Sequence, residues 1–150
     1  MSQIQVAVSS VIDAPAEAVY TILADYHNHH PQILPQSHFT SIEVEEGGYG
    51  AGNILRFTME VFGNKQEYHS RVTEPEPGRV LAETDMLSGA VTTFTVTPAG
   101  AQSDVTIATT VPRQPGLRGF IEGLMTSPIL RRIYRQELQN LNQYAQRIEQ

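Results

Sequence analysis

The side chains with the most chemical potential in this sequence are the histidines of the segment His27-Asn28-His29-His30. Imidazole nitrogens bind zinc, and they also accept and donate protons near neutral pH. A zinc site needs three or four converging ligands, which adjacent side chains such as His29 and His30 rarely provide, so we expect no metal. Because Ile33 and Leu34 follow, His30 is expected beside an apolar pocket. The alternative is a polar loop at the pocket mouth.

A second group of polar side chains lies in the segment 66–73, which alternates between two faces. Val72 is apolar and is expected to point inward, so Tyr68 and Ser70 share its face and could offer hydroxyl groups to a ligand. His69 then points outward. The alternative for Tyr68 is ordinary core packing, in which its ring is buried and its hydroxyl finds a hydrogen-bond partner.

The composition limits the classes of function. The chain has 150 residues, 40% apolar and 17% charged, which is typical of one folded domain with its own core. A formal net charge of -6 disfavours nonspecific nucleic-acid binding, which needs a basic surface. The absence of cysteine excludes disulfides, thiolate nucleophiles and cysteine-based zinc sites. No apolar run approaches the ~18 residues of a membrane span. The N-terminus does not resemble a signal peptide, so we expect a cytoplasmic location.

The C-terminal segment 116–150 is the longest element that the sequence predicts. Its apolar residues recur at steps of three and four, which indicates an amphipathic helix. The apolar stripe slips between Leu124 and Leu130, and Pro128 lies at the slip. We therefore predict a short helix at about 117–125, a break at 126–128, and a long helix that begins at Pro128 with Ser127 as its N-cap.

The N-terminal segment predicts one strand followed by helical structure. Residues 3–12 alternate between apolar and polar side chains, as in a half-buried strand. Pro15 is expected at the first position of a short helix, with a buried stripe of Val19, Ile22, Leu23 and Tyr26. Prolines 31 and 35 limit the next segment to a turn or one further short helix.

Six more strands are predicted, at 39–46, 54–62, 66–73, 80–84, 90–97 and 104–111. The connections between them are short, which favours antiparallel hairpins. A tight turn is expected at Gly63-Asn64. The glycine-rich segment 47–52 lacks the Gly-Lys-Ser/Thr ending of a phosphate-binding loop and precedes a strand, so a flexible hairpin turn is expected there.

Three segments resemble those of a known superfamily: 11–20 (VIDAPAEAVY), 72–81 (VTEPEPGRVL) and 92–98 (TTFTVTP). On these residues, the whole chain resembles the START/Bet v 1-like (SRPBCC) superfamily, and within it the bacterial polyketide cyclase/dehydrase-like proteins. The resemblance implies an α+β helix-grip fold over residues 1–150 as a single domain. In that fold a curved seven-stranded antiparallel sheet wraps around a long C-terminal helix, two short helices follow the first strand, and an internal apolar cavity lies between sheet and helix.

The resemblance and the alternation together indicate which side chains line the cavity. Each of them could instead pack simply as core. The predicted ligand-binding residues are Tyr26, His30, Leu34, Leu55, Phe57, Met59, Tyr68, Ser70, Phe94, Phe120, Ile121 and Leu124.

Three classes of function remain open. The leading hypothesis is binding of a hydrophobic, lipid- or polyketide-like small molecule without a cofactor, by a monomer or homodimer. The alternative is a polyketide cyclase/dehydratase-type enzyme that uses the same cavity. Cyclisation of a poly-ketone needs a shaped pocket, a proton-transfer group and a donor for the enolate oxygen, and Tyr26, His30 and Tyr68 are residue types that could serve. A third class is a protein-interaction module.

Overall fold

The structure is a computed structural model that describes residues 3–112 and 125–148. Seven strands and two α-helices make up most of this part of the chain, and one 3-10 helix, η1, follows the first α-helix. In chain order the elements are β1 (Gln3–Ile12), α1 (Ala16–Ala24), η1 (His30–Gln32), β2 (Phe39–Glu46), β3 (Ile54–Val61), β4 (Asn64–Glu76), β5 (Val80–Asp85), β6 (Val91–Ala99), β7 (Gln102–Pro112) and α3 (Pro128–Ile148).

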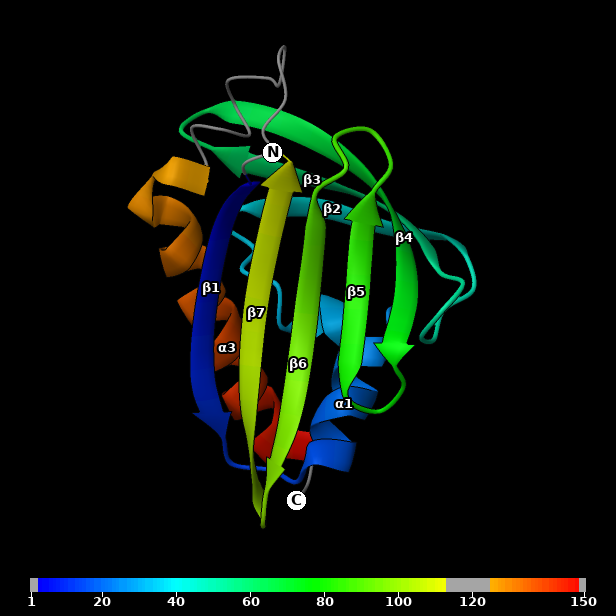
Figure 1. Ribbon diagram of the computed structural model, residues 1–150, viewed down its shortest axis with the longest axis vertical. Coiled ribbons are helices and arrows are strands. Elements are labelled where there is room, and N and C mark those ends of the chain that lie inside the picture. Colours follow the sequence, from blue (N-terminus) through cyan, green and yellow to red (C-terminus); the bar gives the residue numbers. More distant parts are fainter. Residues whose placement is uncertain (1–2, 113–124, 149–150) are drawn as a thin grey trace.

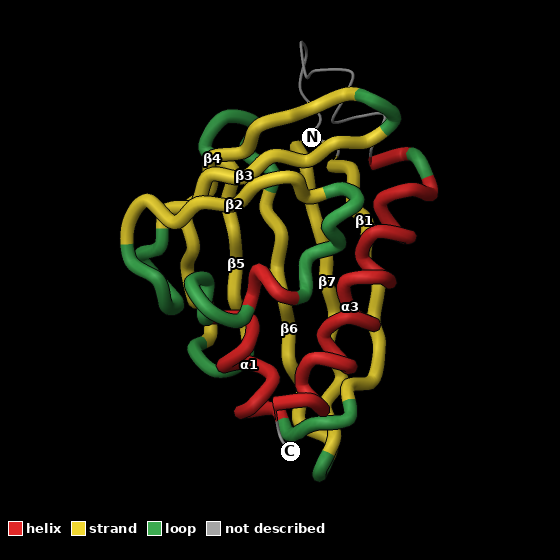
Figure 2. The backbone as a smooth tube through the Cα atoms, turned by 180° about the vertical axis from the view of Figure 1, so that it is seen from behind, coloured by secondary structure: helices red, strands yellow, loops and turns green. Residues whose placement is uncertain are grey.

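The strands form one antiparallel sheet in the order β1-β7-β6-β5-β4-β3-β2. The sheet curves, so that β2, β3 and β4 arch across one end of the molecule (Figure 1). Figure 2 looks onto the concave face, where α1 and α3 lie in front of the central strands. The predicted seven-stranded helix-grip arrangement is thereby confirmed. No helix in the described ranges is long and apolar enough to cross a bilayer.

The two predicted short helices after β1 are only partly present. α1 is a true helix, but His30–Gln32 form a single 3-10 turn, closed by the hydrogen bond from Ile33 N to His30 O. Pro31 has no N–H and Pro35 follows closely, so a longer helix cannot form here. Pro15 is the N-cap of α1, one position before the predicted place, with an extended backbone at ψ 153°.

The predicted start of the long helix is confirmed. Ser127 is a bend, and its Oγ accepts a hydrogen bond of 3.2 Å from the N–H of Ile129, which caps α3 at Pro128. The helix packs on β1 and α1 and buries one face. The buried residues of that face are Leu130, Ile133, Tyr134, Glu137, Leu138, Leu141 and Ala145. The short helix predicted at about 117–125 lies outside the described residues except for Met125.

The Gly63-Asn64 turn differs from the prediction by one residue, whereas the glycine-rich turn lies where it was predicted. β3 ends at Val61 and β4 begins at Asn64, so the hairpin turn is Phe62-Gly63, one residue earlier than expected. Both residues have positive φ, 54° and 78°, as a two-residue hairpin turn that follows the sheet twist requires. The glycine-rich segment 47–52 is held against the end of α1 by hydrogen bonds from Tyr26 N to Gly48 O and from Gly50 N to Ala24 O. The predicted hairpin turn between β2 and β3 is thus present, and it is hydrogen-bonded to the end of α1.

Candidate functional site

A cavity lies between the concave face of the sheet and α3. Its volume is about 690 Å³, a figure that includes the solvent at its mouth, so the enclosed part is smaller. Apolar side chains from β3, β6 and α3 form much of its wall. Seven of the predicted residues line it, namely His30, Leu34, Phe57, Met59, Tyr68, Ser70 and Phe94.

A smaller pocket of about 230 Å³ adjoins the cavity, and shares His30, Leu34 and Phe57 with it. Tyr26 and Leu55, the remaining described candidates, line this pocket. Phe120, Ile121 and Leu124 lie outside the described residues. The ligand-binding roles of all these side chains stay predictions, although the nine that are described share one hollow region. Those on strands meet there because alternate residues of a strand lie on the same face of the sheet.

The sequence analysis missed the acidic residues of the cavity. Glu83 from β5 and Glu137 from α3 both line it, together with the hydroxyl-bearing side chains of Thr92, Thr109 and Tyr134. A signal for Glu137 was present, because position 137 falls three residues after Tyr134 and four before Leu141, within the apolar stripe of the helix. A charged residue within such a stripe is expected to be buried.

Glu137 is the most unusual group of the site. It is 2% exposed, and its Oε2 has no hydrogen-bond partner among the described residues. Burial raises the pKa of this carboxyl well above its usual range, and the negative charge of Glu83 adds to the effect. Burial therefore favours the neutral acid, and its Oε2 is left without a hydrogen-bond partner.

His30 faces Glu137 from η1, and their Nε2 and Oε2 atoms lie 3.9 Å apart. His30 Nδ1 donates a hydrogen bond of 2.6 Å to the carbonyl of Leu23. The ring stacks on Tyr26 with centroids 4.6 Å apart, and Phe94 meets it edge-on at 5.3 Å. Burial lowers the pKa of the imidazole. His30 is therefore a fixed, neutral ring whose free nitrogen points toward Glu137.

Two further tyrosines support the site. The hydroxyl of Tyr26 donates a hydrogen bond of 2.6 Å to Glu83 Oε2, and burial raises the tyrosine pKa well above its usual range. The hydroxyl of Tyr134 is hydrogen-bonded to that of Thr109, and burial raises the Tyr134 pKa as well. Burial therefore favours the neutral hydroxyl form of both tyrosines.

The other histidines lie apart from the cavity. His27 Nε2 is 3.0 Å from the carbonyl of Gly47, and His29 Nδ1 shares a hydrogen bond of 2.6 Å with the hydroxyl of Tyr144. His29 and His30 thus point toward different parts of the molecule. Within residues 3–112 and 125–148, no three histidine, aspartate or glutamate side chains gather as metal ligands.

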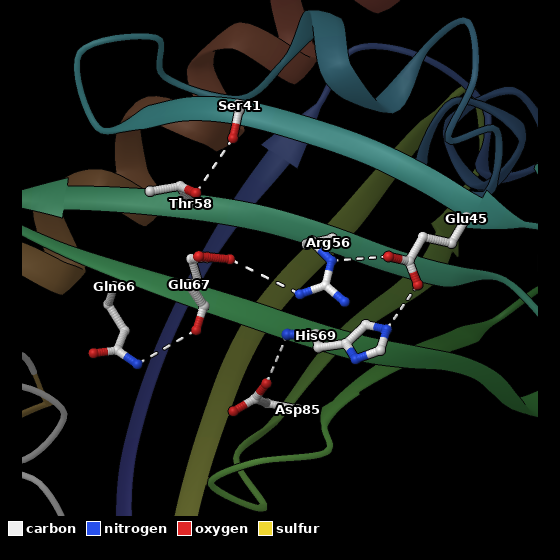
Figure 3. A network of polar contacts seen from close by, with 8 residues as sticks. All are labelled: Ser41, Glu45, Arg56, Thr58, Gln66, Glu67, His69 and Asp85. Carbon is white, nitrogen blue, oxygen red and sulfur yellow. Dashed lines mark hydrogen bonds and ion pairs between the residues drawn. The ribbon is translucent and has the colours of Figure 1, made fainter.

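His69 faces outward, as predicted, in a polar network on the convex side of the sheet (Figure 3). Its Nε2 lies 2.8 Å from Glu45 Oε1, and Arg56 donates to the other oxygen of Glu45 at 2.8 Å. The hydrogen bond from Arg56, followed by that from His69, lowers the Glu45 pKa. Exposed pairs of this kind contribute little to stability, so the network is a surface feature of β2, β3 and β4.

A curved sheet around a long helix, with a cavity between them, defines the START/Bet v 1-like class of helix-grip proteins. Residues 3–146 match the family model described as polyketide cyclase / dehydrase and lipid transport, and the chain belongs to that family. The resemblance that the sequence indicated is thereby confirmed. A search of curated proteins finds no match to the chain.

Solved structures with this fold include three informative neighbours. The KanY protein is 29% identical, with a TM-score of 0.82 over 97% of this chain and 99% of its own. The ZhuI aromatase/cyclase of Streptomyces sp. R1128 is 19% identical, with a TM-score of 0.77 over 99% and 97% of the two chains. A norcoclaurine synthase mutant from Thalictrum flavum is 18% identical, with a TM-score of 0.74 over 99% and 98%. The last two support the fold alone.

Proposed function

We propose that this protein binds a small hydrophobic molecule in the cavity between the sheet and α3. The observation that carries the proposal is the apolar wall of that cavity, formed by side chains such as Phe57, Met59 and Phe94. Burial of apolar ligand surface stabilises a complex by ~25 cal/mol per Å² before the costs of association are subtracted. The family description, which names lipid transport and polyketide cyclisation, agrees with an apolar ligand.

Ala90 offers a way to test the cavity by filling it. This side chain lines the cavity and is partly buried against the core. Ala90→Trp is expected to weaken binding of the neutral fluorescent probe N-phenyl-1-naphthylamine by at least about tenfold, because the indole occupies the space that the probe needs. Fluorescence titration of wild type and variant measures the dissociation constants.

Ala99→Trp is the matched control, since Ala99 is the exposed last residue of β6, the strand that begins directly after Ala90. It should bind the probe as wild type does. Equal affinity in all three proteins, or saturable binding in none of them, would contradict the proposal. Circular dichroism of each variant establishes that the comparison is made between folded proteins.

A second candidate function, a cyclase/dehydratase-type enzyme, is favoured by the His30–Glu137 pair. A buried acid and a neutral imidazole whose facing atoms are 3.9 Å apart could act as proton donor and proton acceptor at one substrate. His30 would take a proton from a carbon between two carbonyl groups. The enolate carbon would bond to another ketone carbon, while Glu137 gives its proton to that ketone oxygen. Return of the proton from His30 to Glu137 would restore both groups.

This candidate predicts turnover of a linear triketone thioester into its cyclic isomer, which has the same mass and is separated from the substrate by chromatography. Glu137→Gln keeps the shape of the side chain but cannot transfer the proton, so the rate should fall about 100-fold. A rate no higher than that of buffer in the wild type would refute the catalytic role and leave ligand binding intact.

The remaining expectations stay predictions. They are a cytoplasmic location, a single domain over residues 1–150, no nucleic-acid partner, no cofactor, and a monomeric or homodimeric state. The third class of function, a protein-interaction module, has less support than ligand binding, for which the structure offers a cavity.

A further inference from the structure

We infer that His30 and Glu137 together bind one hydroxyl group of the ligand, so that the cavity selects a neutral, hydroxyl-bearing apolar molecule over a carboxylate. This inference rests on the proposed binding function and narrows its ligand class. It comes from the open hydrogen-bonding capacity of the two side chains and from the distribution of charge around them.

Glu137 has one side-chain oxygen, Oε2, without a hydrogen-bond partner. Only two buried side-chain oxygens in the described parts of the chain lack a hydrogen-bond partner, Asn53 Oδ1 and Glu137 Oε2, and of these two residues only Glu137 lines the cavity. An unpaired buried polar group destabilises a folded protein, so such a group in a cavity wall indicates a partner that the cavity receives. In its protonated form, which burial favours, Glu137 can donate one hydrogen bond to it.

His30 supplies a hydrogen-bond acceptor, Nε2, that faces Glu137. A carbonyl oxygen can only accept, so the 2.6 Å contact with Leu23 O requires that Nδ1 carry the proton. In the neutral ring Nε2 is then an acceptor. The stacked ring of Tyr26 and the edge contact with Phe94 hold this tautomer in place.

The distance between the two atoms fits one shared oxygen. An oxygen that lies ~2.8 Å from both His30 Nε2 and Glu137 Oε2 forms a triangle on their 3.9 Å separation, with an angle of roughly 90° at the oxygen. A hydroxyl satisfies both sides, because it donates to Nε2 and accepts from the protonated carboxyl. A ketone oxygen could satisfy only the carboxyl.

The charges around the pair disfavour an anionic ligand. Glu83, Asp85 and Glu137 are the charged residue types in the described part of the wall, which contains no lysine or arginine. Asp85 already accepts from His69 N, Ser88 N and Ser88 Oγ, and Glu83 accepts from Tyr26. A ligand carboxylate would therefore meet like charges and an unprotonated imidazole nitrogen, with no basic side chain to neutralise it.

The test compares four probes of one shape: naphthalene, 2-naphthol, 2-naphthoate and 2-naphthylmethylamine. Each competes with N-phenyl-1-naphthylamine for the wild-type protein at pH 7. We expect 2-naphthol to bind about tenfold more tightly than naphthalene, because it gains two hydrogen bonds of modest net value. We expect 2-naphthoate to bind more weakly than naphthalene. Tightest binding of the amine would overturn the inference in favour of a cation site.

Two variants of Glu137 separate this inference from the function on which it rests. Glu137→Leu should abolish the preference for 2-naphthol over naphthalene, whereas Glu137→Gln, which retains an N–H donor, should keep most of the preference. If naphthalene binds but 2-naphthol has no advantage in the wild type, or if Glu137→Leu keeps that advantage, only the hydroxyl site is wrong. If no probe competes, the proposed binding function fails as well.

Discussion

Leu138→Asp is expected to prevent the protein from folding. Leu138 lies in the middle of α3, is 1% exposed and belongs to the core between that helix and the sheet. The substitution removes an apolar side chain from the core and buries a carboxylate there without a partner. The combined cost, at least about 4–5 kcal/mol, is comparable with the whole stability of a typical domain. Circular dichroism and a thermal melt of the purified variant measure the effect.

Gln139→Asp is the matched control, because Gln139 is the next residue on the same helix and is exposed. It should change the melting temperature by no more than a few degrees, as exposed substitutions usually do. A folded Leu138→Asp protein with the wild-type melting temperature would mean that α3 does not pack through this face.

Glu137→Leu is expected to stabilise the protein by about 1–3 kcal/mol. The substitution replaces a buried carboxyl with an unpaired oxygen by an apolar side chain of similar size, on the same face of α3 as Ile133, Leu138 and Leu141. The same variant should lose hydroxyl-selective binding, so stability and ligand selectivity oppose each other at this position. Denaturant unfolding of wild type and variant gives the difference in free energy.

The stabilisation of the Glu137→Leu variant relative to the wild type should grow as the pH rises. Because burial raises the Glu137 pKa in the folded state, the wild type binds an extra proton on folding at any pH between the ordinary glutamate value of 4.5 and the raised one. The contribution of Glu137 to the stability of the wild type is therefore most favourable below pH 4.5, and it becomes less favourable as the pH increases. His30, whose pKa is lowered, acts in the opposite direction below its ordinary value of 6.5, but both proteins contain it.

Thermal melts at pH 5 and pH 8 should therefore show the larger gap in melting temperature between the variant and the wild type at pH 8. An equal gap, or a less stable variant, would show that Glu137 is not buried as a neutral acid.

The alternation of side chains predicted the strands and their inner faces well. Tyr68 and Ser70 face α3 while His69 lies outside, because a period of two residues fixes the face of every position once one apolar position is placed. The start of α3 at Pro128 was also predictable, since a serine N-cap followed by proline is a local signal.

The polar centre of the cavity could not be predicted in the same way. The burial of Glu137 has a signal in the apolar stripe of α3, but its meeting with Glu83 and His30 has none, because only the fold brings β5 and α3 to the same cavity as His30. The tautomer of His30 depends on a carbonyl in α1 seven residues earlier, which no side-chain pattern records. The fixed turn at 47–52 likewise depends on backbone hydrogen bonds to the end of α1.

The central claim, that an apolar molecule enters the cavity, is tested most directly at the methionine methyl groups. The chain has four methionines, of which Met59 and Met125 line the cavity, while Met86 lies on a turn and is 43% exposed. Protein labelled with ¹³C at these methyls is titrated with N-phenyl-1-naphthylamine, and single Met→Leu variants assign the signals. We predict saturable shifts of the Met59 and Met125 signals and an unmoved Met86 signal. Shifts at Met86 alone, or at none of the three, would contradict the claim.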